Sequence, residues 1–290
     1  MLRALTLLTT IVLVPGLAHA QKQITLLATL TDPADRPVAA VDATRVTVTE
    51  NDTPLKVLKV EAVNRVPKLH LLVDAGVGLP PDALGQLRKG LHGLVDALPD
   101  TLWVSVVTTA PQPRFIERGT AGREKLHKAI DLIASDSSSG RFVESLYEVT
   151  DRIERDRDSN NVVISVGTFA GDLQMRDDDA KKIVERIGSG RIRVHVVLYS
   201  GRVNSTGGGS VQQMVSEVAT KNSGGRFELI NVSNRLATLL PEIGTEVAKT
   251  MGGSARQIRV TVERQQSGDL GRVSLGVTGA ALSQLALEAR

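Results

Sequence analysis

Asp74 is the residue whose setting best predicts a functional site. It follows a short apolar run at residues 69–73 and precedes a loop with Gly76 and Gly78, after which a helix is expected at residues 82–98. A strand, a tight loop and a helix in this order are typical of an open α/β sheet, which binds ligands at the carboxyl ends of its strands. The Asp74 carboxylate could contact a ligand there. We favour a structural role, in which it accepts backbone N–H bonds from the loop and caps the helix.

Other groups of residues that could do chemistry have simpler explanations. Three aspartates at residues 177–179 stand where a helix is expected to begin, and acids there interact well with the helix dipole. The glycines at residues 207–209 lack the Lys-Ser/Thr of a phosphate-binding loop and indicate a flexible lid or insertion. The histidines lack the HExxH spacing of a zinc site. His70 and His195 lie in expected strands, where we expect packed, hydrogen-bonded side chains.

Composition narrows the function further. The chain of 290 residues has no cysteine, which excludes disulfides, thiolate metal sites and cysteine nucleophiles. Its formal charge of +3 is too small and too dispersed to indicate nucleic-acid binding. There is no G-x-S-x-G sequence, and no nucleophile can be paired with a base. We therefore expect a protein that is not an enzyme and holds no cofactor.

The first 20 residues have the form of a secretory signal. Arg3 precedes an apolar stretch at residues 4–17, and Ala18 and Ala20 fit the small-residue pattern of a cleavage site after Ala20. The stretch is shorter than the ~20 residues of a spanning helix, and a Pro-Gly step interrupts it. No later segment is apolar enough to span a membrane. We therefore expect an exported protein, periplasmic or secreted, without a membrane span.

Patterning divides the remaining chain into three parts. Residues 21–65 and 255–279 show the period-two alternation of strands, and we expect them to join in one small β-module. Residues 66–251 alternate between buried strands and amphipathic helices, which predicts an α/β fold with a doubly wound, mainly parallel, Rossmann-like sheet. The tail at residues 280–290 is expected to be a short helix or disordered.

At this point residues 66–251 resemble a von Willebrand factor type A domain. The resemblance rests on the strand that ends in Asp74, the Leu146-Tyr147 step in the third expected helix, and residues 211–227, where a helix, Gly-Gly and an aromatic strand follow one another. The order of elements carries it, because no single motif is strong. The flanking β segments are similar to those of a bacterial exported subgroup of this family.

The resemblance implies a metal-ion-dependent adhesion site, but this sequence departs from its pattern. The family has Asp-x-Ser-x-Ser after the first strand, a Thr before the third helix and an Asp after the fourth strand. Here Gly76 and Gly78 replace the two serines, and Val166 stands where the second Asp is expected. Glu144 falls at the Thr position. Because a magnesium-like ion needs several hard oxygen ligands, we expect a degenerate site without metal.

We therefore expect a non-catalytic binding or scaffold protein that recognises a protein partner. Its loops at residues 74–81, 136–144, 167–178 and 201–210 would form the ligand-binding face. The residues expected on this face are Asp74, Gly76, Gly78, Glu144, Thr168 and Asp172. One alternative is a metal-dependent adhesin with a remodelled site at Asp74, Glu144 and Asp172. A second is a hydrolase with an unrecognised site, which a serine–histidine contact on the loop face would favour.

Overall fold

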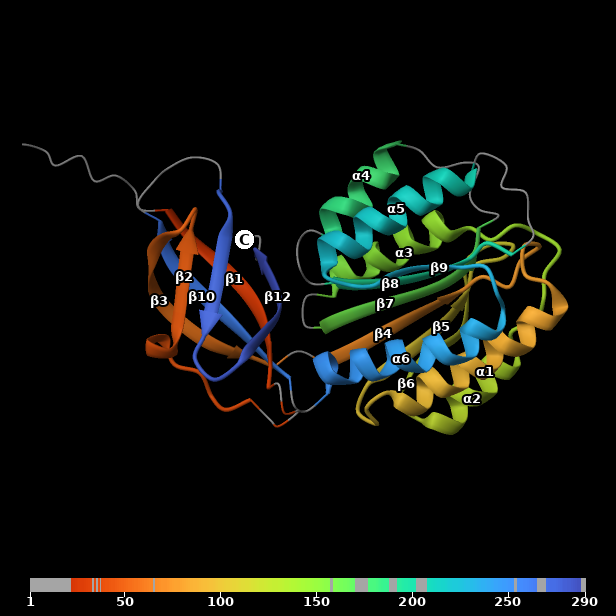
Figure 1. The fold of residues 1–290 in the computed structure, drawn as a ribbon, viewed down its shortest axis with the longest axis horizontal. Coiled ribbons are helices and arrows are strands. Elements are labelled where there is room, and N and C mark those ends of the chain that lie inside the picture. Colours follow the sequence, from red (N-terminus) through yellow and green to blue (C-terminus); the bar gives the residue numbers. More distant parts are fainter. Residues whose placement is uncertain are drawn as a thin grey trace, which may run out of the picture.

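The computed structural model describes residues 22–287, apart from residues 33, 35, 37, 65, 157–158, 170–176, 188–191, 202–207, 253–254 and 265–269. Within this part the chain forms two sheets of six strands each. Figure 1 shows them as two neighbouring units, a β-module and an α/β domain with helices on both faces of its sheet. The expected signal at residues 1–20 and its cleavage point lie outside the described residues.

The β-module combines both ends of the chain in one antiparallel sheet of order β11-β2-β3-β10-β1-β12. Its strands are β1 (Lys22–Thr31), β2 (Val46–Glu50), β3 (Thr53–Val63), β10 (Arg256–Arg264), β11 (Val273–Val277) and β12 (Ala281–Leu287), with a short 3-10 helix η1 (Ala43–Arg45) before β2. Leu26 of β1 lies opposite both Val260 of β10 and Leu287 of β12. The expected joining of the two ends is therefore confirmed.

The α/β domain is built on a sheet of order β6-β5-β4-β7-β8-β9, in which only the edge pair β5–β6 is antiparallel. Its strands are β4 (Val66–Val73), β5 (Trp103–Thr108), β6 (Arg114–Thr120), β7 (Ser159–Thr168), β8 (Ile192–Tyr199) and β9 (Phe227–Ile230). Its helices are α1 (Pro81–Ala97), α2 (Arg123–Asp131), α3 (Phe142–Arg155), α4 (Asp177–Arg186), α5 (Gly208–Ser223) and α6 (Asn234–Met251). The predicted fold class is confirmed.

Alternate residues of the central strands pack against opposite helix layers. Leu71 faces a core shared with α1, α2 and α6, whereas Leu72 faces a core shared with α3, α4 and α5. Figure 1 shows the two layers on either side of the sheet. Because both faces are covered, the central strands are apolar throughout, which is the pattern that predicted them. This packing fixes the strand ends that carry the candidate site.

Two expectations about local structure were wrong. The tail does not form a helix, because Ala281–Leu287 is strand β12. Its sequence suits a helix, but pairing with β1 decides its conformation. Gly208 and Gly209 belong to the first turn of α5 rather than to a lid, although residue 207 lies outside the described residues. By contrast, α4 begins at Asp177, as the three aspartates predicted.

The described helices include none long and apolar enough to cross a membrane.

Candidate functional site

Asp74 lies at the point where the order of the strands reverses. The chain goes from β4 outward to β5 and β6 and then returns to β7 on the other side of β4. Open α/β sheets bind ligands in the crevice outside the carboxyl ends of their strands at such a point. Asp74 follows β4 directly, and Thr168 ends the neighbouring strand β7. Two of the predicted site residues therefore meet in this crevice.

The Asp74 carboxylate is buried and engaged by hydrogen bonds. Asp74 is only 3% exposed. Oδ1 accepts the backbone N–H of Gly76 at 2.8 Å, while Oδ2 accepts the Thr168 hydroxyl at 2.8 Å and the Thr168 backbone N–H at 3.3 Å. Such bonds hold the loop after β4 against the end of β7. Asp74 thus accepts backbone N–H bonds, as predicted.

The prediction that Asp74 caps the following helix was wrong. The N-cap of α1 is Pro80, and no side chain caps it. Pro81 occupies the first helical position, where its missing N–H costs nothing. The hydrogen bond from the Gly76 N–H to the Asp74 side chain instead closes a turn over residues 74–76, before the helix begins. Asp74 stabilises the loop and the adjoining strand rather than the helix.

Two glycines cover the carboxylate with backbone. A Cβ atom at Gly140 would lie 2.3 Å from Asp74 Cγ and 2.4 Å from each carboxylate oxygen. A Cβ atom at Gly76 would lie 2.5 Å from the Ser138 carbonyl oxygen and 2.8 Å from Asp74 Oδ1. The family's serine at position 76 therefore does not fit this backbone. These two positions require glycine because other chain segments approach so closely.

Backbone hydrogen bonds join the surrounding loops into one block. The N–H of Val77 donates to the Ser138 carbonyl at 3.0 Å, and the N–H of Asp136 donates to the Ala75 carbonyl at 2.9 Å. Thr109 connects this block to the sheet: its N–H donates to Val73, and its carbonyl accepts the N–H of Arg141. Loops from three different parts of the chain therefore form a single edge with a fixed shape.

The surroundings of Asp74 disfavour the charged form of its carboxyl group. Burial raises the pKa of Asp74, the hydrogen bonds from Gly76 and Thr168 oppose this rise, and the nearby charge of Asp136 adds to it. Burial and Asp136 raise the pKa because a negative charge is costly away from water and close to another negative charge, whereas the hydrogen bonds stabilise the charged form. Asp136 itself accepts the N–H of Ser138 at 2.7 Å. Asp136 begins the loop at residues 136–144, which was expected on the same face as Asp74, but it was not among the predicted site residues.

A divalent ion does not fit the residues around Asp74. Gly76 and Gly78 carry no hydroxyl, Val166 is buried and apolar where the family has an acid, and Gly140 lies on the carboxylate. Magnesium needs near-octahedral oxygen ligands. Throughout the described part of the chain, no three or more His, Asp or Glu side chains form a group that could hold a metal ion.

The other predicted face residues have different surroundings. Gly78 is buried in the loop after β4. Glu144 lies exposed in the first turn of α3, where it accepts a hydrogen bond from Arg141 Nη1 at 2.8 Å. In this loop it is Gly140, which sequence reasoning missed, that touches Asp74. Asp172 lies outside the described residues. The one available signal for Gly140 was its position at the end of the polar loop before α3.

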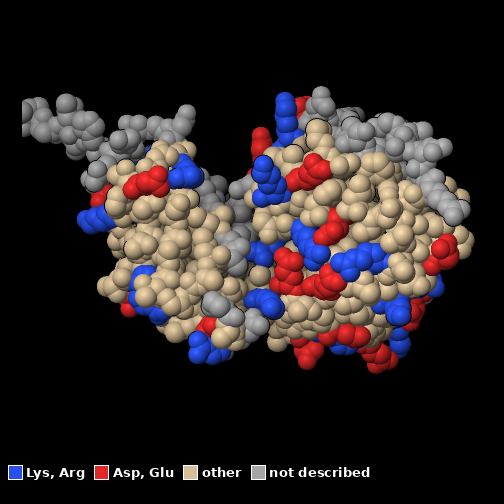
Figure 2. Space-filling model, in the orientation of Figure 1, with Lys and Arg blue, Asp and Glu red and all other residues tan. Residues whose placement is uncertain are grey.

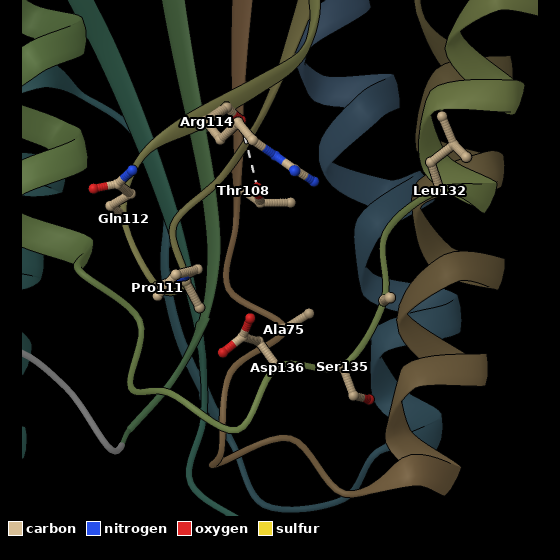
Figure 3. A pocket seen from close by; sticks show the side chains of 10 residues that line it. Ala75, Thr108, Pro111, Gln112, Arg114, Leu132, Ser135 and Asp136 are labelled. Carbon is tan, nitrogen blue, oxygen red and sulfur yellow. Dashed lines mark hydrogen bonds between the residues drawn. The ribbon is translucent and has the colours of Figure 1, made fainter.

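Two hollows open beside the loop that follows β4. One, of about 260 Å³, is lined by Ala75, Thr108, Arg114 and Asp136, among others. Figure 3 shows the Arg114 side chain extending across it toward the side of Leu132, while the Thr108 hydroxyl donates to the Arg114 carbonyl at 3.4 Å. Arg114 and Asp136 thus bring charge to a hollow that is also lined by apolar residues such as Pro111 and Leu132.

The second hollow is larger. It has a volume of about 750 Å³ and is lined by Val77, Tyr199 and Val232, with parts of the adjoining loops. Val77 is 59% exposed and Val232 is 54% exposed. Apolar side chains this open, beside a fixed loop block, are typical of surfaces that bind other molecules. The edge therefore offers two hollows, each lined by both apolar and polar side chains.

A serine–histidine contact exists, but away from the loop face. Ser105 Oγ lies 2.9 Å from His70 Nδ1, and Asn161 Oδ1 lies 3.4 Å from His70 Nε2. Burial lowers the pKa of His70 to about 4, which makes it a weak base at neutral pH. Strand β5 is paired on both sides, so its backbone N–H groups serve the sheet rather than an oxyanion. This contact lacks the features of a hydrolase site.

His70 has the hydrogen-bonded setting that was predicted, but His195 does not. Both ring nitrogens of His195 are buried without a hydrogen-bond partner in the described structure. Burial, with the charges of Arg193 and Arg226, lowers its pKa to about 3, so the ring is neutral. The expectation of a hydrogen-bonded side chain at position 195 was therefore wrong.

Comparison with solved structures identifies the fold. The chain is similar to a von Willebrand factor type A protein from Catenulispora acidiphila, with a TM-score of 0.53 and 12% identity over 93% of this chain and 74% of that one. It is similar to proximal thread matrix protein 1 of the mussel byssus, with a zinc-occupied adhesion-site motif, at a TM-score of 0.50 and 10% identity over 74% of this chain and 50% of that one. BatB from Bacteroides thetaiotaomicron matches at a TM-score of 0.46 and 14% identity over 63% and 99% of the two chains.

No protein-family model matches the sequence, and no curated protein matches it either. At identities this low, structural likeness concerns the fold alone. The chain has the von Willebrand factor type A fold, and the resemblance seen in the order of its elements is confirmed at that level. What the site does must be argued from its own residues.

Proposed function

We propose that this chain is an exported, non-catalytic protein that recognises a protein partner through the loop edge around Asp74, without a metal ion there. The observation that carries the proposal is the position of Gly140, whose backbone lies on the Asp74 carboxylate. In the type A fold this edge is expected to bind ligands through a metal. Here the same place is filled by the chain itself, so recognition has to use the surface around it.

That surface has the properties of a protein-binding patch. Val77 and Val232 are exposed beside the larger hollow, and Arg114 and Asp136 supply charge beside the smaller one. Apolar side chains surrounded by polar groups are the common composition of a binding patch. The hydrogen-bonded loops hold the backbone of Val77 and Asp136 in place before binding, which lowers the entropy cost of association. A protein surface can complement both hollows at once.

Export is the second part of the proposal and rests on the sequence of residues 1–20. Intact-mass analysis of material recovered from outside the cytoplasm tests it directly. A chain that begins at Gln21 supports export, whereas a mass that includes residues 1–20 contradicts it.

The partner-binding surface is tested with paired substitutions. Val77→Glu and Val232→Glu place charges in the larger hollow, and Val218→Glu is the matched control, because Val218 is an exposed valine on α5. Each variant, tagged and in its mature form, is used to capture partners from its own envelope fraction, and bound proteins are quantified by mass spectrometry. We expect a protein retained by the wild type and by Val218→Glu to be lost at least tenfold with the two hollow variants.

EDTA separates this proposal from the metal-dependent adhesin. Capture of the same partner should be unchanged in EDTA, because no ion is needed at Asp74. Equal capture by all the valine variants would contradict the assignment of the surface. Loss of capture in EDTA with recovery in magnesium would contradict the metal-free mechanism.

A further inference from the structure

Two histidines and two aspartates form a symmetric group between α1 and α2. His92 and Asp96 are four residues apart on α1, and His127 and Asp131 are four residues apart on α2. The two imidazole rings meet end to end, with centroids 4.9 Å apart and planes inclined by 28°. His92 Nε2 lies 3.0 Å from Asp131 Oδ1, and His127 Nε2 lies 3.0 Å from Asp96 Oδ1. Each carboxylate therefore holds the histidine of the opposite helix.

These contacts decide where the ring protons are. A carboxylate only accepts hydrogen bonds, so Nε2 of both His92 and His127 carries the N–H. In a neutral imidazole the other nitrogen, Nδ1, then has a lone pair. The two Nδ1 atoms face each other at 2.6 Å. Two lone pairs at this distance repel unless a positively charged species lies between them.

We propose that this pair of Nδ1 atoms, on His92 and His127, binds a divalent transition-metal ion of the zinc type. Imidazole nitrogen is a preferred ligand of zinc, copper and nickel, whereas magnesium prefers oxygen. Asp96 and Asp131 act as outer partners, which fix the ring orientation and raise the basicity of the ligating nitrogen. The charge of the ion also offsets the two carboxylates.

The two rings must move apart and turn to accept the ion. With Zn–N bonds of about 2.0–2.1 Å in tetrahedral geometry, the two nitrogens would be about 3.3 Å apart. The nitrogens would therefore separate by about 0.7 Å, and each ring would turn so that both lone pairs point at the ion. Each imidazole is 31% exposed, so solvent and ion can reach it. No third acidic, histidine or cysteine ligand is arranged around the same point in the described chain, so water fills the remaining positions.

This site is separate from the edge around Asp74. It lies in the helix layer formed by α1, α2 and α6, and none of its four residues takes part in the loop block. The proposed zinc site therefore does not depend on the proposed partner binding. Figure 1 shows α1 and α2 packed side by side, which is the arrangement that brings the two helices' ligands together.

Isothermal titration calorimetry with zinc chloride and, separately, magnesium chloride tests the proposal on the mature chain. We expect saturable binding of one zinc ion and none of magnesium. His92→Gln and His127→Gln should abolish zinc binding. Asp96→Asn and Asp131→Asn should weaken it about 10–100-fold, the usual effect of removing an outer partner. Asp100→Asn is the control, because Asp100 is an exposed acid paired with Arg123, and it should bind zinc like the wild type.

Thermal melting in the presence of zinc distinguishes a loss of zinc binding from a folding defect. Zinc should raise the melting temperature of the wild type and not that of the histidine variants. If a histidine variant fails to fold, the comparison of Asp131→Asn with Asp100→Asn still decides, because only the first should lose affinity. Absence of saturable zinc binding to the wild type would overturn the proposal and leave a shared proton between the rings. Undiminished binding by both histidine variants would also overturn it.

Discussion

The edge around Asp74 and the histidine pair of α1 and α2 both gather titratable side chains, but they differ in where the lone pairs point. At Asp74, donors from Gly76 and Thr168 occupy the carboxylate, and Gly140 closes the space above it. At His92 and His127, carboxylates occupy the outer nitrogens and leave the inner two facing each other. The capacity to bind an ion thus depends on free lone pairs and space, not on the place that the fold usually uses.

The difference has a simple structural origin. Asp74 lies in a crevice that several loops fill, so its hydrogen bonds and its pKa are set by burial. The histidine pair lies on a partly exposed seam between two helices, where solvent reaches both imidazole rings. Figure 2 shows acidic and basic residues interspersed over the face of the α/β domain seen there, without a large area of one sign. Local geometry, not the overall field, therefore decides which of the two sites can hold a ligand.

The largest expected effect comes from breaking the closure of the Asp74 edge. Gly140→Ala places a Cβ atom on a buried carboxylate and should destabilise the protein by about 3 kcal/mol or more, because neither the strand end nor the loop can move easily. Gly85→Ala is the control. Gly85 is in α1 with open space around it, so alanine there should stabilise by about 0.5–1 kcal/mol. Urea unfolding measures both.

A similar small effect for the two glycine substitutions would contradict the closed edge. In that case Gly140 would be able to withdraw from Asp74, and a site open to ligands would become the better description. The comparison with the histidine pair would then lose its basis.

The pH dependence of stability sharpens the comparison of buried acids. Because the pKa of Asp74 is raised in the folded state, its protonated form favours folding. The wild type should therefore lose stability relative to Asp74→Asn as the pH rises from about 3.8 through the folded-state pKa, by at most about 1.4 kcal/mol per pH unit. Unfolding in urea at a series of pH values measures this slope.

Glu50 of the β-module should show a pH dependence of stability opposite to that of Asp74. Its hydrogen bonds from Arg264, at 2.6 and 2.8 Å, lower the pKa of Glu50, and burial opposes them. Its contribution to stability should be present above the ordinary pKa of 4.5 and disappear as the pH falls through the folded-state pKa. Relative to Glu50→Gln, the wild type should therefore lose stability on acidification. Slopes of the same sign for Asp74 and Glu50 would refute the environment assigned to one of them.

The sequence predicts what depends on periodicity and misses what depends on close approach. Apolar runs such as residues 69–73 indicate buried strands because both faces of the sheet are covered, and they located Asp74 correctly. The contact of Gly140 with Asp74 joins loops far apart in the chain, and no local pattern encodes it. The sequence shows that Gly76, Gly78 and Val166 stand where the family has polar ligands. It does not show which residues fill the space beside Asp74.

The histidine pair shows the same limit in another form. The HExxH motif places two histidines on one helix. Here one histidine and one aspartate lie four residues apart on each of two helices, and only the packing of α1 against α2 brings the two histidines together. Strand β12 was missed for a related reason, since its pairing with β1 overrides a sequence that suits a helix.

The smallest expected effect is the response to magnesium, and it distinguishes the two regions in one experiment. Millimolar magnesium should leave the melting temperature of the zinc-free protein unchanged within about 1 °C, because an ion that bound only the folded state at a hundred times its dissociation constant would add about 2.7 kcal/mol, a shift of several degrees. Zinc in the same assay should raise the melting temperature through His92 and His127. A rise with magnesium that Asp74→Asn removes would show that the edge opens around its carboxylate. Because Gly140 occupies the place of an ion there, we expect magnesium to find no oxygen ligands at Asp74 that the chain does not already use.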